Sequence, residues 1–463
     1  MAISNFWMPI LTYLIQKFEM KLWQKDTGSK KEVESFTIGR DPEFDLSLAP
    51  FDVLGSMAHA EMLSKIGLLT KEENQILQKG LRAIYYEIER GEFQIEEGVE
   101  DVHSQVEFLL TERFGDVGKK LHSGRSRNDQ VLVDLKLYYR AAIRELVNDS
   151  SELFDLLLKL AEKHKSDLMP GYTHTQLAMP SSFGLWFGSI AEGLSEDLGL
   201  LKAAFDLSNK NPLGSAAGYG SSFPLDRTLT TQLLGFADLH HNVINAQNSR
   251  GKTERTLGFA MAGLAGTLNR MAADICIFMN QHFAFVSFPD ELTTGSSIMP
   301  HKKNPDVFEL IRAKTNQIQA IPNTVNLLLT NTTTGYHRDL QLLKEEIFPG
   351  LATLKSCLEM STFMLKSIRI KENILLDPFY KHLFSVEVVN ELVLKGIPFR
   401  DAYKKVGLDI EKGEFAPDQT NLNHTHEGSI GNLNLKEIQE KMNQAIRQFR
   451  FEEIDKAIMS LLS

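Results

Sequence analysis

The longest uninterrupted helical pattern in the chain lies in residues 125–169, which contain neither glycine nor proline. Its apolar positions are separated by steps of three, four and seven, and they include Leu132, Leu135, Tyr139, Ala142, Leu146, Leu153 and Leu157. Such steps place the side chains on one face of a helix. At 1.5 Å per residue these 45 residues would extend about 68 Å, which is long for a compact domain.

Further segments show the same helical pattern, at 226–248, 253–286, 306–331 and 338–369. Alternation typical of strands is scarce, so the predicted fold class is all-α. The pattern divides the chain into an N-terminal extension of unclear status (1–19), an N-terminal helical domain (20–124), a central long-helix bundle (125–371) and a small C-terminal helical domain (372–463). One subunit of this size cannot bury the full apolar face of such a helix, so we expect oligomerisation through the bundle.

The charge balance and the cysteine count narrow the class of protein. The chain has 50 basic and 60 acidic residues, a net charge of −10, which argues against nucleic acid as a partner. Only Cys276 and Cys357 are present, so a disulfide framework is excluded and a reducing, cytoplasmic setting fits best. The most apolar segment, near 256–279, contains Arg270 and Asp274, so we expect no membrane helix.

Two polar motifs precede predicted helices in the first third of the chain. In EDVHSQVE (100–107), Asp101 is a candidate N-cap beside His103, and taken alone a capping role is favoured. In LHSGRSRNDQ (121–130), Ser123, Arg125 and Asn128 stand immediately before the long helix. Free backbone N–H groups at a helix start, combined with arginines, favour an anion site over a polar cap.

Three later motifs also concentrate polar residues in loops. MPGYTHTQLAMP (169–180) places Thr173 and His174 between two prolines, and a structural and a functional role are equally supported. TTGSSIMPHKKNP (293–305) predicts a mobile polar loop with Ser296 or Ser297, Lys302 and Asn304; Glu309 follows a little over one turn into the next helix. In GYHRDLQLLKE (335–345), Tyr336, Gln341 and Lys344 recur at helical spacing, so a solvated face is favoured.

Metal, nucleotide and serine-hydrolase signatures are weak or missing. There is no His-Glu-x-x-His and no cysteine pair, and NHTHEG (423–428) is a lone His-x-His in a polar loop. Neither a Walker loop nor a G-x-S-x-G turn occurs. The motifs therefore support metal binding and serine-hydrolase chemistry poorly.

Taken together, the motifs resemble a known family. GSSIMPHKKNPD is similar to the loop shared by the fumarase/aspartase superfamily, and LHSGRSRNDQ resembles the motif particular to the argininosuccinate lyases. EDVHS, MPGYTHTQLAMP, NPLGS and GYHRDLQLLKE also match, and all six occur in the family's order across about residues 20–430. The resemblance implies three mainly helical domains, a twenty-helix core in a homotetramer, and active sites that take loops from three subunits.

The resemblance also implies a reaction: the reversible cleavage of argininosuccinate to arginine and fumarate, without cofactor or metal. By the family's pattern, Ser296 is the base, Lys302 and Asn304 hold the developing oxyanion, and His174 is a second proton-transfer residue oriented by Glu309. The implied substrate contacts are Asn128 and Thr173 for carboxylates or the amino-acid end, Tyr336, Gln341 and Lys344 for the arginine half, and Ser123, Arg125 and His103 as further members of the site. Whether arginine biosynthesis or the urea cycle is the physiological use stays open.

The chain departs from the family's pattern at several points. FTIGRDPEFD stands where an Asn-x-Ser element is usual, with Asp41 near the serine's place. Thr175 replaces a leucine, and TERT at 253–256 replaces an Asp-Arg-Asp run, so Arg255 is the nearest match there. The family's start resembles Lys21–Trp23, which makes Met20 a candidate start.

Two alternatives to this function are retained. Another fumarate-releasing lyase of the superfamily, adenylosuccinate lyase or fumarase, is disfavoured by LHSGRSRNDQ and GYHRDLQLLK. A non-catalytic crystallin-like homologue is disfavoured because Ser296, His174, Lys302 and Glu309 are all present.

Overall fold

The computed structural model describes residues 31–96, 99–419 and 422–463. The N-terminal extension 1–19 and the candidate start at Met20 lie outside the described residues. The chain is mainly helical, which confirms the predicted all-α class. Among the described residues, no helix is both long enough and apolar enough to cross a bilayer.

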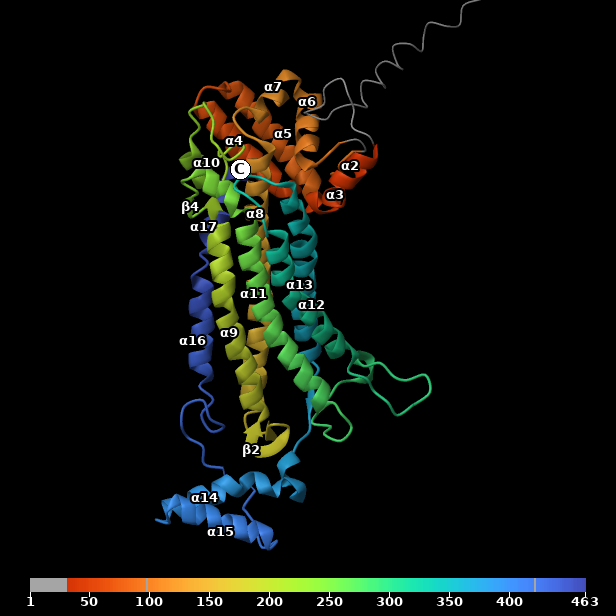
Figure 1. The fold of residues 1–463 in the computed structure, drawn as a ribbon, viewed down its shortest axis with the longest axis vertical. Helices are drawn as coiled ribbons and strands as arrows, with labels where there is room; N and C mark the ends of the chain where they lie inside the picture. The colour runs from red at the N-terminus through yellow and green to blue at the C-terminus, as the bar shows by residue number, and fades with distance from the viewer. Residues whose placement is uncertain (1–30, 97–98, 420–421) are drawn as a thin grey trace, which may run out of the picture.

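Five long helices form a central bundle that runs the length of the molecule (Figure 1). They are α8 (Arg127–Lys163), α9 (Phe183–Ser208), α11 (Val243–Phe278), α12 (Asp306–Leu328) and α13 (Leu343–Leu365). Helix α11 contacts each of the other four, so it forms the centre of the bundle. At 1.5 Å per residue, the 37 residues of α8 extend about 56 Å.

The apolar face predicted for α8 is buried, but mostly within a single chain. Leu132, Leu135 and Tyr139 are at most 2% exposed, and Leu146, Leu153 and Leu157 are equally covered. The expectation that this face needs a second subunit is therefore wrong, because α9 and α13 of the same chain cover it. Apolar side chains are instead exposed on the other bundle helices, among them Leu200, Phe259, Ile277, Leu310, Leu327 and Phe363.

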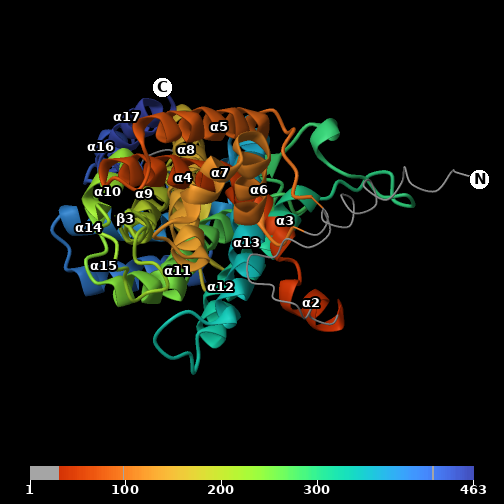
Figure 2. The same cartoon turned by 90° about the horizontal axis from the view of Figure 1, so that it is seen from above.

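Smaller helices cover the two ends of the bundle. At the upper end in Figure 1 lie α2 (Lys31–Ile38), α3 (Asp41–Asp45), α4 (Ala49–Lys65), α5 (Lys71–Glu89), α6 (Val102–Phe114), α7 (Asp116–Lys119) and α10 (Arg227–Leu233). Figure 2 shows α4 to α7 lying across that end when the molecule is seen from above. At the lower end, α14 (Ser385–Leu394) and α15 (Phe399–Glu411) share a small core of their own.

The chain then returns along the bundle. Helix α16 (Leu435–Arg447) packs against α9 and α8, and α17 (Phe451–Leu462) packs against α10 and α4 at the upper end. The C-terminus therefore lies beside the N-terminal helices (Figure 1). The predicted domain boundaries at 124 and 371 stay a prediction.

Several element boundaries differ from the predicted ones. The long helix ends at Lys163, and residues 168–182 form a hairpin, β1 (Leu168–Thr173) paired antiparallel with β2 (Gln176–Ser182). The segment 226–248 divides into α10, a short strand β4 (Asp238–Leu239) and the start of α11. Helix α9 was not among the predicted long helices, because four glycines interrupt its pattern.

Two further pairs of short strands complete the structure. Strand β3 (Lys210–Asn211) pairs parallel with β4, and β5 (Val286–Ser287) pairs antiparallel with β6 (Arg369–Ile370). Each of these strands has only two residues, so each pair does no more than join two neighbouring segments of the chain. The 3-10 turn η4 (Arg338–Leu342) leads directly into α13 and brings the 335–345 motif to the upper end of the bundle.

Candidate active site

A cavity of about 280 Å³ lies where the N-terminal helices meet the upper end of the bundle. Five of the residues predicted to contact substrate line it: His103, Asn128, Tyr336, Gln341 and Lys344. They come from the starts of α6 and α8 and from the segment that leads into α13. Segments distant in the sequence are therefore brought together on one wall.

The first turn of α8 is held by a reciprocal cap. The Ser126 side chain accepts a hydrogen bond from a backbone N–H of that turn, and the Asp129 carboxylate accepts one from Ser126 N at 2.8 Å. The other oxygen of Asp129 accepts from the N–H groups of Gly214 and Ala216, each at 2.9 Å. The NPLGS segment is thereby fixed against the helix start, and Asn128 is left facing the cavity.

Asp101 caps α6 as predicted, and it also forms an ion pair with Arg127. Asp101 Oδ1 accepts from Ser104 N at 2.8 Å, while Oδ2 pairs with Arg127 Nε at 2.9 Å. Burial alone would raise the pKa of Asp101, but His103 and Arg127 outweigh it and leave the pKa lowered. Asp101 therefore stays ionised and joins the two helix starts that border the cavity.

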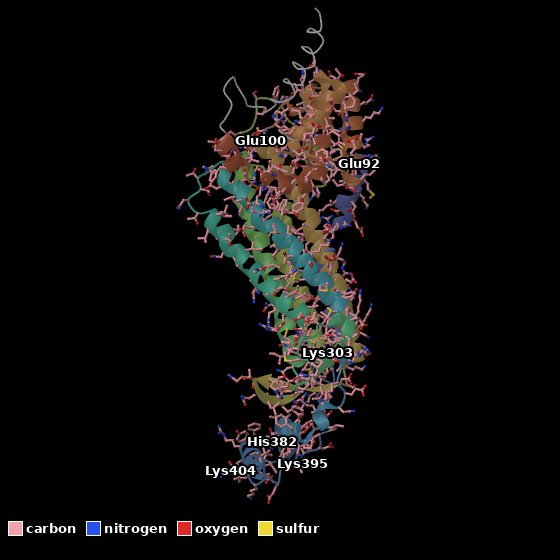
Figure 3. The ribbon with its side chains drawn as sticks, turned by 90° about the vertical axis from the view of Figure 1, so that its right-hand side faces the viewer. Glu92, Glu100, Lys303, His382, Lys395 and Lys404 are labelled. Atoms are coloured by element: carbon pink, nitrogen blue, oxygen red, sulfur yellow. The ribbon has the colours of Figure 1, made fainter. Side chains whose placement is uncertain are left out.

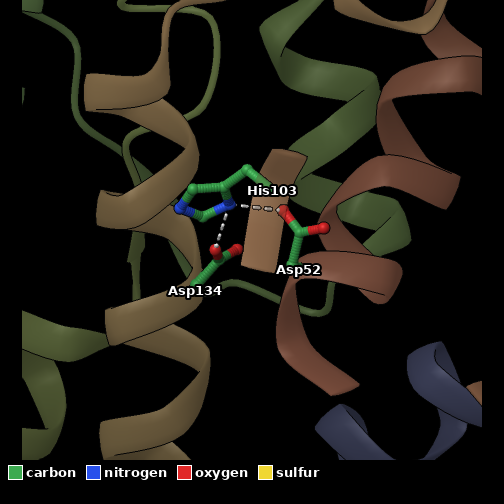
Figure 4. A group of neighbouring side chains, drawn as sticks. All are labelled: Asp52, His103 and Asp134. Carbon is green, nitrogen blue, oxygen red and sulfur yellow. Dashed lines mark hydrogen bonds and ion pairs between the residues drawn. The ribbon is translucent and has the colours of Figure 1, made fainter. Parts of the chain in front are cut away.

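His103 lies in a buried cluster with two aspartates (Figure 4). Its Nδ1 is 2.8 Å from Asp52 Oδ1 on α4 and 3.4 Å from Asp134 Oδ2 on α8. Burial would lower the pKa of His103, but Asp52, Asp101 and Asp134 outweigh it and raise the pKa to about 9. Burial also raises the pKa of Asp134 well above its usual range. The ring is therefore an imidazolium at neutral pH.

Arg125 supplies the second positive charge of this cluster. It is buried, and its Nη1 donates to Ser56 Oγ at 3.0 Å. Burial lowers the pKa of Arg125, and the nearby Asp52, Asp129, Glu107 and Asp134 act in the opposite direction. Asp52, Asp134, His103 and Arg125 are called here the buried charge cluster. Ser123 meets the same region through its carbonyl, 2.9 Å from His59 Nε2.

The same three residues, Asp52, His103 and Asp134, are the group in the described part of the chain whose ligand atoms could surround a metal ion. The pKa of His103 is about 9, so at neutral pH a metal ion would have to displace a proton from this ring. The predicted absence of a metal stays a prediction.

In the 335–345 segment, Gln341 and Lys344 are buried, whereas Tyr336 and Arg338 are exposed although they line the cavity. Gln341 Nε2 donates to the carbonyls of Thr37 and Ile38 at 3.2 and 2.9 Å. Lys344 Nζ lies 2.6 Å from carboxylate oxygens of both Asp41 and Asp45. Two side chains predicted to bind substrate therefore also anchor the end of α2 and helix α3 beside the cavity.

Arg250 and Arg338 also line the cavity, although the sequence motifs assigned neither of them to the site. Arg250 lies where α11 breaks: its ψ is 134°, and the following Gly251 has φ +87°. The break turns its guanidinium toward the cavity, where it donates to Leu340 O at 3.2 Å and lies 5.7 Å from the Tyr336 ring centroid. Arg255, the match proposed from the motif, is exposed and does not line the cavity. In the sequence, the interruption of the helical pattern at 249–252 was the feature that could have pointed to Arg250.

Thr173 and His174 lie at the opposite end of the molecule. Thr173 pairs with Gln176 across the hairpin, and the two-residue tip consists of His174 (φ +52°) and Thr175 (φ +60°). Positive φ at both tip positions is the geometry of a type I′ turn, which is strained for a β-branched threonine. The tip is exposed, so His174 projects away from its own chain.

The loop at 293–305 is also at the lower end, before α12. Asn304 N donates to Thr294 O at 2.9 Å, which closes the loop at its base, and Lys303 pairs with Asp290. Ser296 Oγ accepts from Ile298 N and Met299 N at 3.3 and 3.0 Å. Lys302 is exposed on the loop, and Glu309 is exposed in the first turn of α12.

The predicted site residues thus fall into two groups within one chain. The cavity group is at the upper end, near Glu100, and the loop that carries Ser296, Lys302 and Asn304 is near Lys303 at the lower end (Figure 3). The hairpin with Thr173 and His174 is also at the lower end (Figure 1). One chain therefore does not place the candidate base beside the candidate binding residues.

The raised pKa of His103 generates a prediction on stability. Its folded pKa of about 9 exceeds the ordinary value of 6.5, so its contribution to the free energy of unfolding is complete below about pH 6.5 and is lost as pH rises through 9. The full contribution is about 3 kcal/mol, from 1.36 kcal/mol per pKa unit. In urea unfolding, the difference between the natural protein and His103→Asn is expected to shrink over that range.

Comparing the two proteins at each pH removes the effect of other groups. Burial lowers the pKa of Lys136 to about 7, which makes stability rise with pH over part of the same range. That effect is present in both proteins and cancels in the difference. A difference that stays constant from pH 6.5 to 9 would show that His103 is not an imidazolium.

Comparisons with known proteins agree with the family resemblance. A family model described as "Lyase" matches residues 17–320, more than half of the chain. The argininosuccinate lyase of Bacteroides fragilis is 59% identical over 442 residues, which cover 96% of this chain and 99% of the relative. The argininosuccinate lyase of Thermotoga neapolitana is 39% identical over 391 residues, covering 83% and 97%.

Solved structures show the same fold at low identity. An EDDS lyase in complex with formate matches with a TM-score of 0.72 and 20% identity, covering 94% of this chain and 95% of that one. A class II fumarase from Schistosoma mansoni matches with a TM-score of 0.67 and 16% identity, covering 89% and 95%. The likeness to these structures supports the fold alone, whereas the sequence relatives settle the family: this chain belongs to the argininosuccinate lyases.

Proposed function

We propose that the protein catalyses the reversible cleavage of argininosuccinate to L-arginine and fumarate. The observation that carries the proposal is that five residues assigned to substrate binding from the family's motifs line one cavity. Family membership at 59% identity supports the same reaction. A small substrate that carries both carboxylates and cationic groups suits a cavity bordered by both signs of charge.

The reaction requires three kinds of group. A base removes a proton from the carbon next to a carboxylate, and the electron pair moves onto that carboxylate as an aci-carboxylate. The double bond of fumarate then forms as the bond to the guanidino nitrogen breaks, in an anti elimination. An acid returns a proton to the departing nitrogen. Positive groups and N–H donors must stabilise the charge that develops on the carboxylate.

We assign the role of base to Ser296. A serine hydroxyl is a weak base unless its alkoxide is stabilised. The N–H groups of Ile298 and Met299 already point at Ser296 Oγ, and Lys302 belongs to the same loop. These donors favour the ionised oxygen when the loop covers a bound substrate and excludes water. In the proposed mechanism Lys302 and Asn304 also contact the developing oxyanion.

His174 is assigned as the second proton-transfer residue. The strained hairpin tip presents its ring outward, where it can enter a site on a neighbouring subunit. Glu309 is assigned to orient this ring from α12, and Thr173 to contact a substrate carboxylate together with Asn128. Arg125 and His103 support the floor of the cavity through the buried charge cluster.

The assembly is proposed to be a homotetramer with active sites shared between subunits. The separation of the two groups of site residues supports this arrangement, because a single chain leaves each group incomplete. Exposed apolar side chains on α9, α11, α12 and α13 offer the surface that such an assembly would cover. A cytoplasmic location and a role in arginine biosynthesis complete the proposal.

The first test is an absorbance assay for fumarate. With argininosuccinate as substrate, the purified protein is expected to release fumarate and L-arginine in equal amounts, without added metal or cofactor. Adenylosuccinate and malate are the comparison substrates. Release of fumarate from either of these, and none from argininosuccinate, would overturn the proposed substrate.

Replacing the candidate base provides a second prediction. Ser296→Ala is expected to lower kcat by at least about a thousandfold, because the variant lacks the hydroxyl assigned to take the proton, while argininosuccinate still binds. Ser297→Ala is the matched control, since spacing alone does not distinguish the two serines. Calorimetric binding and the fumarate assay are measured for both. Near-normal turnover in Ser296→Ala would assign the base elsewhere.

Shared sites lead to a third prediction about mixed tetramers. Asn128→Ala disables the cavity group, and Ser296→Ala disables the loop group, so each protein alone is expected to be inactive. Co-expressed hybrids are expected to recover part of the activity, because some sites receive an intact cavity from one subunit and an intact loop from another.

The control for this experiment pairs Asn128→Ala with Gln341→Ala. Both residues line the same cavity of one chain, so no subunit in that hybrid has an intact cavity and no recovery is expected. Size-exclusion chromatography checks that tetramers form in each mixture. Hybrids of Asn128→Ala and Ser296→Ala that assemble and stay inactive would contradict shared sites.

A further inference from the structure

Asp41, which departs from the family's motif, occupies a defined place on the cavity wall. It begins α3, lines the cavity, and its Oδ1 is 2.6 Å from Lys344 Nζ. Asp45, one turn later, is at the same distance from Lys344 Nζ. The side chains of Lys344 and Asp45 are 3% and 4% exposed, whereas that of Asp41 is 25% exposed. Asp41 is therefore the member of this trio that an incoming molecule can reach.

The trio carries an excess of one negative charge. One lysine faces two carboxylates, and a buried carboxylate is costly unless a cation compensates it. Burial raises the pKa of Asp41, which is the physical consequence of incomplete compensation. A cationic group placed beside Asp41 would restore the balance. The cavity thus prefers a ligand that brings a positive charge to this wall.

The other charged groups of the cavity specify what else that ligand carries. Arg250 and Arg338 line the same cavity, and Arg250 lies close enough to Asp41 to influence its titration. Guanidinium groups bind carboxylates with two parallel hydrogen bonds. His103 also lines the cavity, and its buried Nε2 has no hydrogen-bond partner in the described structure. An ammonium and a carboxylate on one carbon atom, as in an α-amino acid, match this wall.

We propose that Asp41 recognises the α-ammonium group of the amino-acid half of the substrate, with Lys344 holding the carboxylate of Asp41 in place and Arg250 receiving the α-carboxylate. The inference rests on the proposed function in taking arginine as that half. It makes Asp41 a specificity-determining residue of this chain, at the position where the family's motif usually has a serine. Its expected effect is selection for ligands with a free α-amino group.

The alternative role for Asp41 is purely structural, as a positioning residue for Lys344. The two roles differ in what a neutral replacement does. If Asp41 only positions Lys344, then Asp41→Asn weakens every ligand of the cavity by the same factor. If it binds the ammonium, the loss is confined to ligands that possess one, because only they lose a charge-assisted hydrogen bond.

The experiment is calorimetric titration of the full-length protein with L-arginine and with 5-guanidinopentanoate, which lacks the α-amino group. The natural protein is expected to prefer L-arginine by at least about tenfold in Kd. Asp41→Asn is expected to abolish that preference by weakening L-arginine alone. Asp41→Ser, which keeps a hydrogen-bond acceptor without the charge, provides a second variant should the amide destabilise the fold.

Glu43→Gln is the matched control, because Glu43 lies on the same short helix and pairs with Arg40 at the surface. It is expected to keep the full preference. Equal weakening of both ligands in the Asp41 variants, no change in either, or no preference in the natural protein would each overturn the proposal. The fumarate assay is read separately from the titration. If the protein prefers L-arginine but releases no fumarate, the proposed reaction alone is rejected. If it releases fumarate but shows no preference for L-arginine, the role of Asp41 alone is rejected.

Discussion

The buried charge cluster is the interaction on which the upper end of the molecule depends. Asp52, His103, Asp134 and Arg125 come from α4, α6, α8 and the segment before α8, and they meet where almost no solvent reaches. Charged groups tolerate such burial only when they pair, because removal of one partner leaves an uncompensated charge in a poorly polarisable interior. The cluster therefore fixes the relative positions of three helices, and the cavity is formed on the surface that those helices share.

Two cations that line the cavity are also held by carboxylates. Lys344 is held between Asp41 and Asp45, and Arg127 is held between Glu100 and Asp101. Each cation is oriented by carboxylates before any substrate arrives, so little reorganisation is required on binding. Such preorganisation explains why a site for a highly charged small molecule is lined by so many paired groups.

The bundle imposes a second constraint, which is distance. Helices that run nearly the full length of the molecule carry the cavity at one end and the loop with Ser296 at the other. Helical backbones are stiff over such lengths, so folding of one chain cannot bring the two ends together. Antiparallel neighbours in an assembly would place the lower end of one chain beside the upper end of another. The proposed sharing of active sites follows from this geometry and from the outward direction of the His174 hairpin.

Much of the fold was accessible from the sequence, because helical periodicity and the absence of glycine and proline are local properties of the chain. They predicted the all-α class, the apolar face of α8 and the cap at Asp101. The same local signals failed where tertiary contacts decide the backbone. Its glycines made α9 unrecognisable as a helix in the sequence, although these small residues let neighbouring helices approach closely. The break in α11 at Arg250 and Gly251 is stabilised by Glu254, whose carboxylate accepts a hydrogen bond from Gly251 N at 2.6 Å.

For the site, the sequence by itself determined which chemical groups are present and, through the family's motifs, the reaction class to which they belong. Residue order could not state that Asn128, Gln341 and Lys344 share a cavity, since residues separated by some two hundred positions meet only through packing. Nor could it place Arg250 and Asp41 on that wall. The tertiary structure decided these points, because the burial and pairing of charge depend on neighbours that only the folded chain supplies.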